Sequence, residues 1–247
     1  MAKQVGLLKL RGAIGGITYY KTRHGYLARE SSRIDVERVA TDPVFQRTRE
    51  HASEFGRCVR YGALLVRAFK SVVLNASDGK VGNRMTQRMF KAKNADFKSA
   101  PGFRNCIDGD LGFVEDFEFN DRSSFACVFG APVLTTIDRT SGIVSFSVAS
   151  FLASKVVFAP TGGTHFKIIS AVAAVDFDAG TFEISSTETA ALLLNSIDSV
   201  AVHHLHSVLS VHPLFLVVGI SFHQEMEGNF TALNGGLHNA FRIVAIA

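Results

Sequence analysis

The sequence predicts an α+β protein that consists of an N-terminal β-ribbon, a long helix pair and a C-terminal antiparallel β-sandwich of the immunoglobulin or jelly-roll kind. Apolar residues first recur at every second position, then at every third or fourth, and finally in short runs between turn residues. The turn-forming segment Ser99 to Gly102 lies where the third-or-fourth-position pattern ends and the short apolar runs begin. We therefore expect two domains, a basic region over residues 1–100 and a sandwich over residues 101–247.

The first thirty residues predict the ribbon. Apolar and polar residues alternate from Leu8 to Arg11 and again around Ile17 to Tyr20, and Gly15-Gly16 separates the two runs. A turn at Arg23 to Gly25 leads into a third short strand, Tyr26 to Arg29. A ribbon of this size is not stable alone in water. It must pack on its own subunit or add strands to a neighbouring one, and both alternatives stay open.

Two helices follow a polar link over residues 30–41. Asp42 is suited to the N-cap and Pro43 to the first helical position. A helix to about Leu74 is predicted by apolar residues at successive spacings of 7, 3, 4, 3, 4, 3 and 4, namely Phe45, Ala52, Phe55, Val59, Gly62, Val66, Phe69 and Val73. A second helix is expected from Lys80 to about Asn94, with Val81, Met85 and Met89 on one face.

The C-terminal part contains about nine short apolar runs that are separated by turn residues, which is typical of an antiparallel sandwich. The expected strands are Gly112 to Phe119, Ser124 to Phe129, Gly142 to Val148, Lys155 to Phe158, His165 to Phe177, Thr181 to Ser186, Val200 to Ser210, Leu214 to His223 and Asn239 to Ile246.

Charge is distributed very unevenly along the chain. Residues 1–104 have a net charge of +13, and residues 105–247 have a net charge of −9. This asymmetry favours either a basic surface for a polyanion or opposite faces that stack head to tail. The candidate contact residues for assembly or polyanion binding are Lys9, Arg11, Lys21, Arg23, Arg29, Lys80, Arg84, Arg88 and Lys91.

The sequence contains no recognisable catalytic or cofactor motif. The glycines at 12–16 match neither phosphate-loop pattern, and there is no GxSxG or HExxH. His204 and His206 would share a face of one strand, but no third metal ligand can be named, and structural or interface histidines are favoured. Asp116 and Glu118 would also share a face, without a visible pocket. We expect no catalytic residue, no cofactor, no metal and no enzymatic activity.

The sequence also indicates where in the cell the protein is expected. No apolar segment typical of a secretory signal follows Met1, and the longest apolar run, Leu214 to Phe222, is too short to cross a bilayer. The three cysteines show no CxxC pairing, which fits reduced thiols. We expect a cytoplasmic protein, or a virion or particle component released without a signal peptide, and no membrane partner.

Four segments carry a resemblance to other sequences. They are KLRGAIGGITYYKTRHGYLARE, DPVFQRTREHASEFGRC, Arg104 to Gly109, and Ala159 to Ile168. In these segments the chain resembles an uncharacterised protein family predicted in Bacteroidota genomes. The resemblance covers most of the chain and is most distinctive in the first sixty residues. It implies a bacterial origin and the same two-part architecture, and it transfers no activity and no catalytic residue.

These observations together predict a non-enzymatic structural subunit. We expect it to self-assemble into a filament, a tube or a phage-tail-like particle through its N-terminal arm and its oppositely charged faces. Its partner is then itself, as a homo-oligomer or polymer. The alternative is a nucleic-acid-binding or packaging protein, because cations interleaved with Tyr19, Tyr20 and Tyr26 can contact phosphates and stack on bases.

Overall fold

The computed structural model describes residues 2–31, 35–73, 76, 78–196 and 199–247. The chain divides into two compact units, residues 1–49 (unit 1) and residues 50–247 (unit 2). The sequence predicts the boundary between the two domains near residue 100. The structural division comes earlier because the helices before residue 100 share a hydrophobic core with the C-terminal sheet.

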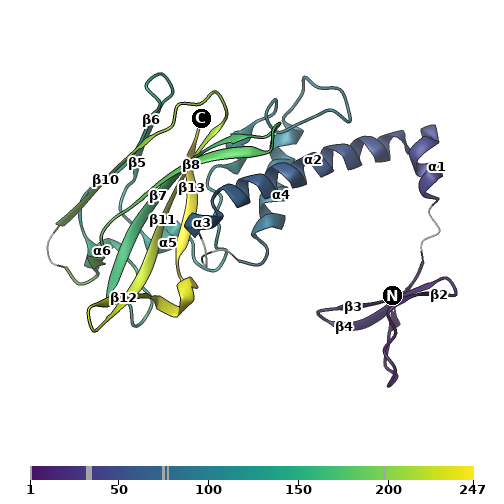
Figure 1. The fold of residues 1–247 in the computed structure, drawn as a ribbon, viewed down its shortest axis with the longest axis horizontal. Helices are drawn as coiled ribbons and strands as arrows, with labels where there is room; N and C mark the ends of the chain where they lie inside the picture. The colour runs from purple at the N-terminus through teal and green to yellow at the C-terminus, as the bar shows by residue number, and fades with distance from the viewer. Residues whose placement is uncertain (1, 32–34, 74–75, 77, 197–198) are drawn as a thin grey trace. The chain divides into compact units, whose positions relative to one another are not determined.

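Unit 1 contains a small antiparallel sheet, which we call the ribbon. Its strands pair in the order β1-β4-β3-β2 (Figure 1). Their bounds are Ala2–Lys3 for β1, Gly12–Ile14 for β2, Ile17–Thr22 for β3 and Gly25–Glu30 for β4. The predicted turn between β2 and β3 is confirmed, since Gly15 and Gly16 have φ of 58° and 83°, which glycine adopts easily. The predicted strand at Leu8 to Arg11 is wrong, because the backbone of Leu10 bonds to the side chain of Gln4 and the strand starts at Gly12.

The helical segment begins as predicted. Asp42 accepts a hydrogen bond from the backbone of Val44 and caps a 3₁₀ turn, η1 (Pro43–Phe45), which leads directly into α2 (Gln46–Ala68). A short helix α3 (Lys70–Val73) follows, and the predicted end at Leu74 lies outside the described residues. The second predicted helix is confirmed as α4 (Val81–Asn94), with Lys80 at its N-cap position. The polar link contains a short helix that was not expected, α1 (Val36–Thr41).

Unit 2 has two antiparallel sheets. In the six-stranded sheet β12, β11, β7 and β8 follow one another, β13 also pairs with β11, and β9 pairs with β7. Its strand bounds are His165–Asp176 for β7, Thr181–Glu188 for β8, Leu192–Leu193 for β9, Leu214–Met226 for β11, Asn229–Ala232 for β12 and Ala240–Ile246 for β13. The three-stranded sheet has the order β10-β6-β5, with bounds Ser199–Ser207 for β10, Ile143–Leu152 for β6 and Leu134–Asp138 for β5.

Six of the nine predicted strands are confirmed, and three are wrong. The three are short helices instead: η3 (Leu111–Val114), α5 (Phe125–Val128) and α6 (Ala153–Val156). Apolar runs of this length do not distinguish a strand from a helical turn. Two of the three turns have a carboxylate that accepts from their first backbone N–H groups. The carboxylate of Asp110 accepts from the backbone of Gly112, and that of Glu118 accepts from the backbone of Phe125. The strands β5, β9 and β12 were not predicted, and a last 3₁₀ turn, η4 (Leu233–Gly236), precedes β13.

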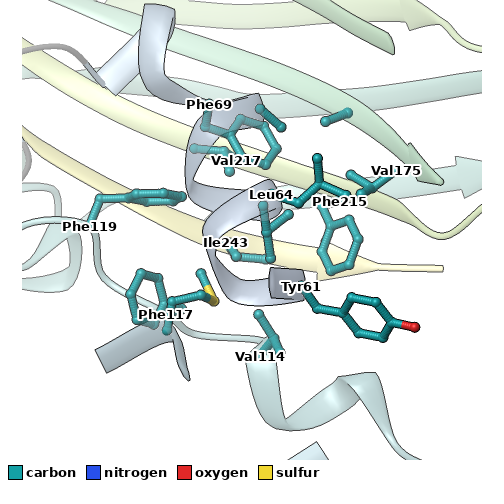
Figure 2. Packing of buried hydrophobic residues seen from close by; sticks show 14 of the residues in the cluster. Tyr61, Leu64, Phe69, Val114, Phe117, Phe119, Val175, Phe215, Val217 and Ile243 are labelled. Atoms are coloured by element: carbon teal, nitrogen blue, oxygen red, sulfur yellow. The ribbon is translucent and has the colours of Figure 1, made fainter. Parts of the chain in front are cut away.

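Two hydrophobic cores lie on opposite faces of the six-stranded sheet. On one face, side chains of β7, β11 and β13 such as Val175, Phe215 and Val217 pack against α2 and α4 (Figure 2). On the other face, alternate residues of β7 and β11 pack against the three-stranded sheet (Figure 1). Unit 2 therefore has three layers, which are a helical layer, the six-stranded sheet and the three-stranded sheet.

A buried ion pair joins the two main helices. Lys93 on α4 places its Nζ 2.7 Å from Oε2 of Glu54 on α2, and each side chain is 3% exposed. The backbone N–H of Gly102 donates to the other oxygen of Glu54, at 2.8 Å. These two bonds hold α2, α4 and the loop after α4 together, because the loss of either partner would leave the buried Glu54 carboxylate uncompensated.

The variant Lys93→Met tests this pair. It leaves the Glu54 carboxylate buried without its cation, so we expect the free energy of unfolding to fall by about 3–5 kcal/mol, as measured by urea denaturation followed by circular dichroism. The matched control is Lys91→Met, an exposed lysine on the same helix, for which we expect a change within about 0.5 kcal/mol. Equal stability of the two variants would contradict a structural role for the pair.

Candidate assembly surface

The ribbon has no hydrophobic core of its own. Among the described residues of unit 1, none is buried. Six apolar side chains near the N-terminus are exposed instead, namely Val5, Leu7, Leu8, Leu10, Ile14 and Ile17. A sheet of this size needs an apolar face covered by another element before it is stable in water. The ribbon is therefore the strongest candidate for an interaction surface in the described part of the chain.

Residues 4–10 form a closed loop, which we call the apolar loop. The side chain of Gln4 accepts from the backbone N–H of Leu10 at 2.9 Å and donates to the carbonyls of Leu10 at 3.3 Å and Leu27 at 3.0 Å. Lys9 donates through Nζ to the carbonyl of Gln4 at 2.7 Å. These bonds close the base of the loop. Its apolar residues Val5, Leu7 and Leu8 are each at least 86% exposed.

The five predicted ribbon cations are all exposed, and each has a local contact. Arg11 and Lys21 both lie over the Tyr26 ring, 5.9 and 5.5 Å from its centroid, and Arg29 lies 5.6 Å from the centroid of Tyr20. Arg23 donates to the ring of His24, and Lys9 closes the apolar loop. A nucleic-acid base would have to displace these cations before it could stack on the tyrosine faces that they cover.

The four predicted cations of the second helix divide into two kinds. Arg84 donates to the carbonyls of Glu118 at 2.6 Å and Phe119 at 3.2 Å, and it pairs with Asp78. Arg88 donates to the carbonyl of Phe113 at 3.2 Å. The side chains of Lys80 and Lys91, in contrast, are exposed. Two of the four cations therefore hold residues 113–119 against α4, and the other two remain available to a partner.

The histidine pair predicted on one strand face is buried between the two sheets of unit 2. On β10, Nδ1 of His204 and Nε2 of His206 lie 2.6 and 2.8 Å from the hydroxyl of Ser170 on β7. Nδ1 of His206 also lies 3.2 Å from the hydroxyl of Ser185 on β8. Burial lowers the pKa of both histidines, that of His206 to about 4. The neutral pair thus joins β10 to the six-stranded sheet.

Metal coordination receives no support from this geometry. Over the described residues, no group of three or more histidine, cysteine or carboxylate side chains is placed to hold a metal ion. The two serine hydroxyls already satisfy the polar atoms of the histidines that face them. The function that the geometry supports is a polar link between the sheets.

The two carboxylates Asp116 and Glu118 do not form an acid/base pair. Asp116 pairs with Arg242, and Glu118 accepts from the hydroxyl of Ser124 at 2.9 Å and from the backbone of Phe125 at 3.1 Å. Burial raises the pKa of Glu118, although these hydrogen bonds and Arg242 oppose that effect. The segment is not a regular strand, so the expectation that the two side chains share a strand face is wrong.

Sequence reasoning did not single out a serine-histidine pair on β11. The Ser221 hydroxyl lies 3.0 Å from Nε2 of His223, beside a cavity of about 400 Å³ that Glu188 and Phe241 also line. Burial lowers the pKa of His223. A catalytic serine also needs a partner that orients Nδ1 of its histidine, and Nδ1 of His223 is buried without a hydrogen bond to any described atom. The pair therefore lacks the arrangement that activates a nucleophile.

Comparisons with protein-family models, with curated proteins and with solved structures found no match to this chain. No helix in the described part of the chain is both long and apolar enough to cross a membrane.

The histidine pair predicts a pH dependence of stability. The folded pKa of His206, about 4, is below its unfolded value of 6.5, so the unfolded state binds more protons between these two values. Stability should therefore fall as the pH drops from 6.5 to 4, by up to about 3 kcal/mol from this group. Urea denaturation of His206→Gln between pH 7.5 and 4.5 should show a shallower fall than the wild type.

The control for this measurement is His203→Gln, an exposed residue on the opposite face of the same strand. Acid also protonates carboxylates, and this background is common to all three proteins. The interpretation would be contradicted by a pH dependence of His206→Gln that matches those of the wild type and of His203→Gln.

Proposed function

We propose that the chain is a non-enzymatic structural subunit that self-assembles into a filament, a tube or a phage-tail-like particle. The observation that carries the proposal is the ribbon, a four-stranded sheet without a buried residue in its described part. Burial of one valine or leucine side chain contributes about 1.5–3 kcal/mol. Val5, Leu7 and Leu8 alone therefore offer several kcal/mol to a contact that covers the apolar loop.

The distribution of charge supports a contact between unlike surfaces. Unit 1 contains ten Lys/Arg and four Asp/Glu, and unit 2 contains sixteen Lys/Arg and eighteen Asp/Glu. A basic ribbon is therefore attracted to acidic surface on the unit 2 of another copy. Such a contact is heterologous, and repeated heterologous contacts produce open polymers unless their rotation closes a ring.

Unit 2 is the body of the particle in this proposal. Its two packed antiparallel sheets would serve as a sandwich of the immunoglobulin or jelly-roll kind, with the helical layer on the outside. The resemblance to a Bacteroidota family suggests a bacterial origin, and the proposed location is the cytoplasm or a released particle. The alternative is that the exposed ribbon cations bind nucleic acid, which the net charge of +5 over residues 1–31 favours.

The proposal is tested by deleting residues 2–29. We expect the full-length protein to form larger species as its concentration rises, in sedimentation velocity and negative-stain microscopy, and to do so less at high salt. The deletion variant should stay monomeric with an unchanged circular dichroism spectrum of unit 2, because both hydrophobic cores lie within unit 2.

Two results would contradict this function. One is a full-length protein that stays monomeric at high concentration and low salt. The other is a deletion variant that still polymerises, because the ribbon would then have no part in the contact. Steeply salt-dependent binding of DNA or RNA without polymer would favour the nucleic-acid alternative.

A further inference from the structure

We propose that the apolar loop of one copy inserts into an acidic hollow on unit 2 of a second copy. The inference rests on the proposed function, and it names the surface that receives the ribbon. The hollow has a volume of about 660 Å³ and lies between the end of β7, the start of β8 and residues 209–212. This size is within the range of pockets that enclose small ligands, roughly 300–1,000 Å³.

The lining of the hollow combines apolar side chains with acids. Leu209 and Val211 line it and are 77% and 91% exposed. Asp176 and Glu183 lie in the same lining. Hydrogen bonds from the backbone of residues 178 and 179, together with the nearby His212, lower the pKa of Asp176 although burial opposes them, so this carboxylate is ionised at neutral pH.

The hollow is held open by its own hydrogen bonds. Arg139 donates to the carbonyls of Ser210 at 3.1 Å and His212 at 3.2 Å, which positions the segment that carries Leu209 and Val211. The one arginine in the lining is therefore engaged with the backbone, and Nε2 of His212 lies 3.6 Å from Oδ2 of Asp176. Glu183 is exposed and forms no ion pair or side-chain hydrogen bond with a described residue, so it is available to a cation from outside.

The apolar loop has the matching chemistry. Its exposed Val5, Leu7 and Leu8 can cover Leu209 and Val211, and Lys9 follows directly in sequence. Residues 1–31 contain six Lys/Arg and one Glu, so the surroundings of the loop are strongly basic. An apolar contact bordered by opposite charges gains from burial at its centre and from electrostatic steering at its rim.

Charge also favours this hollow over the exposed phenylalanines on the loop after α4. Phe97 and Phe103 are 89% and 72% exposed on the loop after α4, but Lys98 and Arg104 directly follow them in sequence. A basic loop would meet like charge there, which is unfavourable across an interface. The acidic hollow is therefore the better partner for the apolar loop.

The connectivity fits contacts that repeat. Each copy has one apolar loop, in unit 1, and one hollow, in unit 2. A loop-to-hollow contact uses only one of the two surfaces on each partner, and the remaining surfaces can accept further copies.

A charge reversal tests the inference. In sedimentation velocity we expect Glu183→Lys to raise the concentration needed for assembly by about tenfold or more, because it places like charges in contact. Glu183→Gln should raise this concentration less, because it removes the attraction without adding repulsion. The control Glu115→Lys reverses an exposed acid outside the hollow and should assemble like the wild type.

Disulfide cross-linking between two differently labelled proteins tests the contact directly. In a Cys127→Ser background, which removes the one exposed cysteine, Leu8→Cys is mixed with Val211→Cys and oxidised. We expect a dimer band on a non-reducing gel that depends on both proteins being present, and a much weaker band when Phe97→Cys replaces Val211→Cys. This readout separates contact between copies from contact within one chain.

The outcomes separate this inference from the proposed function. If the wild type polymerises and deletion of residues 2–29 abolishes polymers, but Glu183→Lys assembles normally, the hollow is overturned and the proposed function stands. A stronger dimer band with Phe97→Cys than with Val211→Cys would likewise overturn the hollow and leave the proposed function standing. If the wild type never associates, the inference and the proposed function both fail.

Discussion

A small β-sheet in water needs at least one face covered by apolar contacts. The sheet of unit 2 meets this requirement, and the ribbon of unit 1 does not meet it with residues of its own. The six-stranded sheet of unit 2 is covered on both faces, because β7 and β11 pair over ten residues and place alternate side chains in two separate cores. The ribbon of unit 1 is covered on neither face by a core of its own. Unit 2 is therefore stabilised by its own two cores, whereas the apolar side chains of the ribbon stay exposed to a possible contact.

Two buried polar links of unit 2 differ in chemistry according to what surrounds them. In the helical layer, Glu54 and Lys93 carry opposite charges that compensate each other, with Nζ of Lys93 2.7 Å from Oε2 of Glu54. Between the sheets, His204 and His206 are kept neutral by burial and bond to serine hydroxyls. Both links fix the relative position of two elements, the helices α2 and α4 in one case and β10 against the six-stranded sheet in the other, which apolar contacts alone specify less strictly.

The sequence was most informative where one signal decided the local structure. Asp42 and Pro43 predicted the helix start, Gly15-Gly16 predicted a turn that needs positive φ, and long alternating or continuous apolar runs predicted β6, β7 and β11. Short runs failed, since the helical turns at 111–114 and 125–128 depend on carboxylate caps from nearby residues. Lys93 was counted only as part of a basic segment, because burial depends on a partner 39 residues away.

The same limits apply to the candidate site. The exposed cations could be identified from composition, but only the structure shows that Arg84 and Arg88 bond to backbone carbonyls of residues 113–119. The alternation from Leu8 predicts a strand over the last residues of the apolar loop, and the sequence gives no indication that Gln4 closes the loop. The hollow is formed by segments that are distant in sequence, namely residue 139, the β7–β8 turn and residues 209–212. No local pattern could have revealed it.

The charge of the ribbon also determines which assemblies are compatible with it. Two ribbons that met face to face would each bring a net charge of +5 from residues 1–31, and like charges across an interface are unfavourable. A closed twofold dimer through the ribbons is therefore disfavoured, although their apolar residues would otherwise attract one another. Contact with an acidic surface of another copy avoids this repulsion. The bonds from Gln4 and Lys9 hold the loop in shape beforehand, so less conformational entropy is lost on contact. A heterologous contact of this kind leaves one loop and one hollow free at the ends of every chain of subunits, and growth can continue.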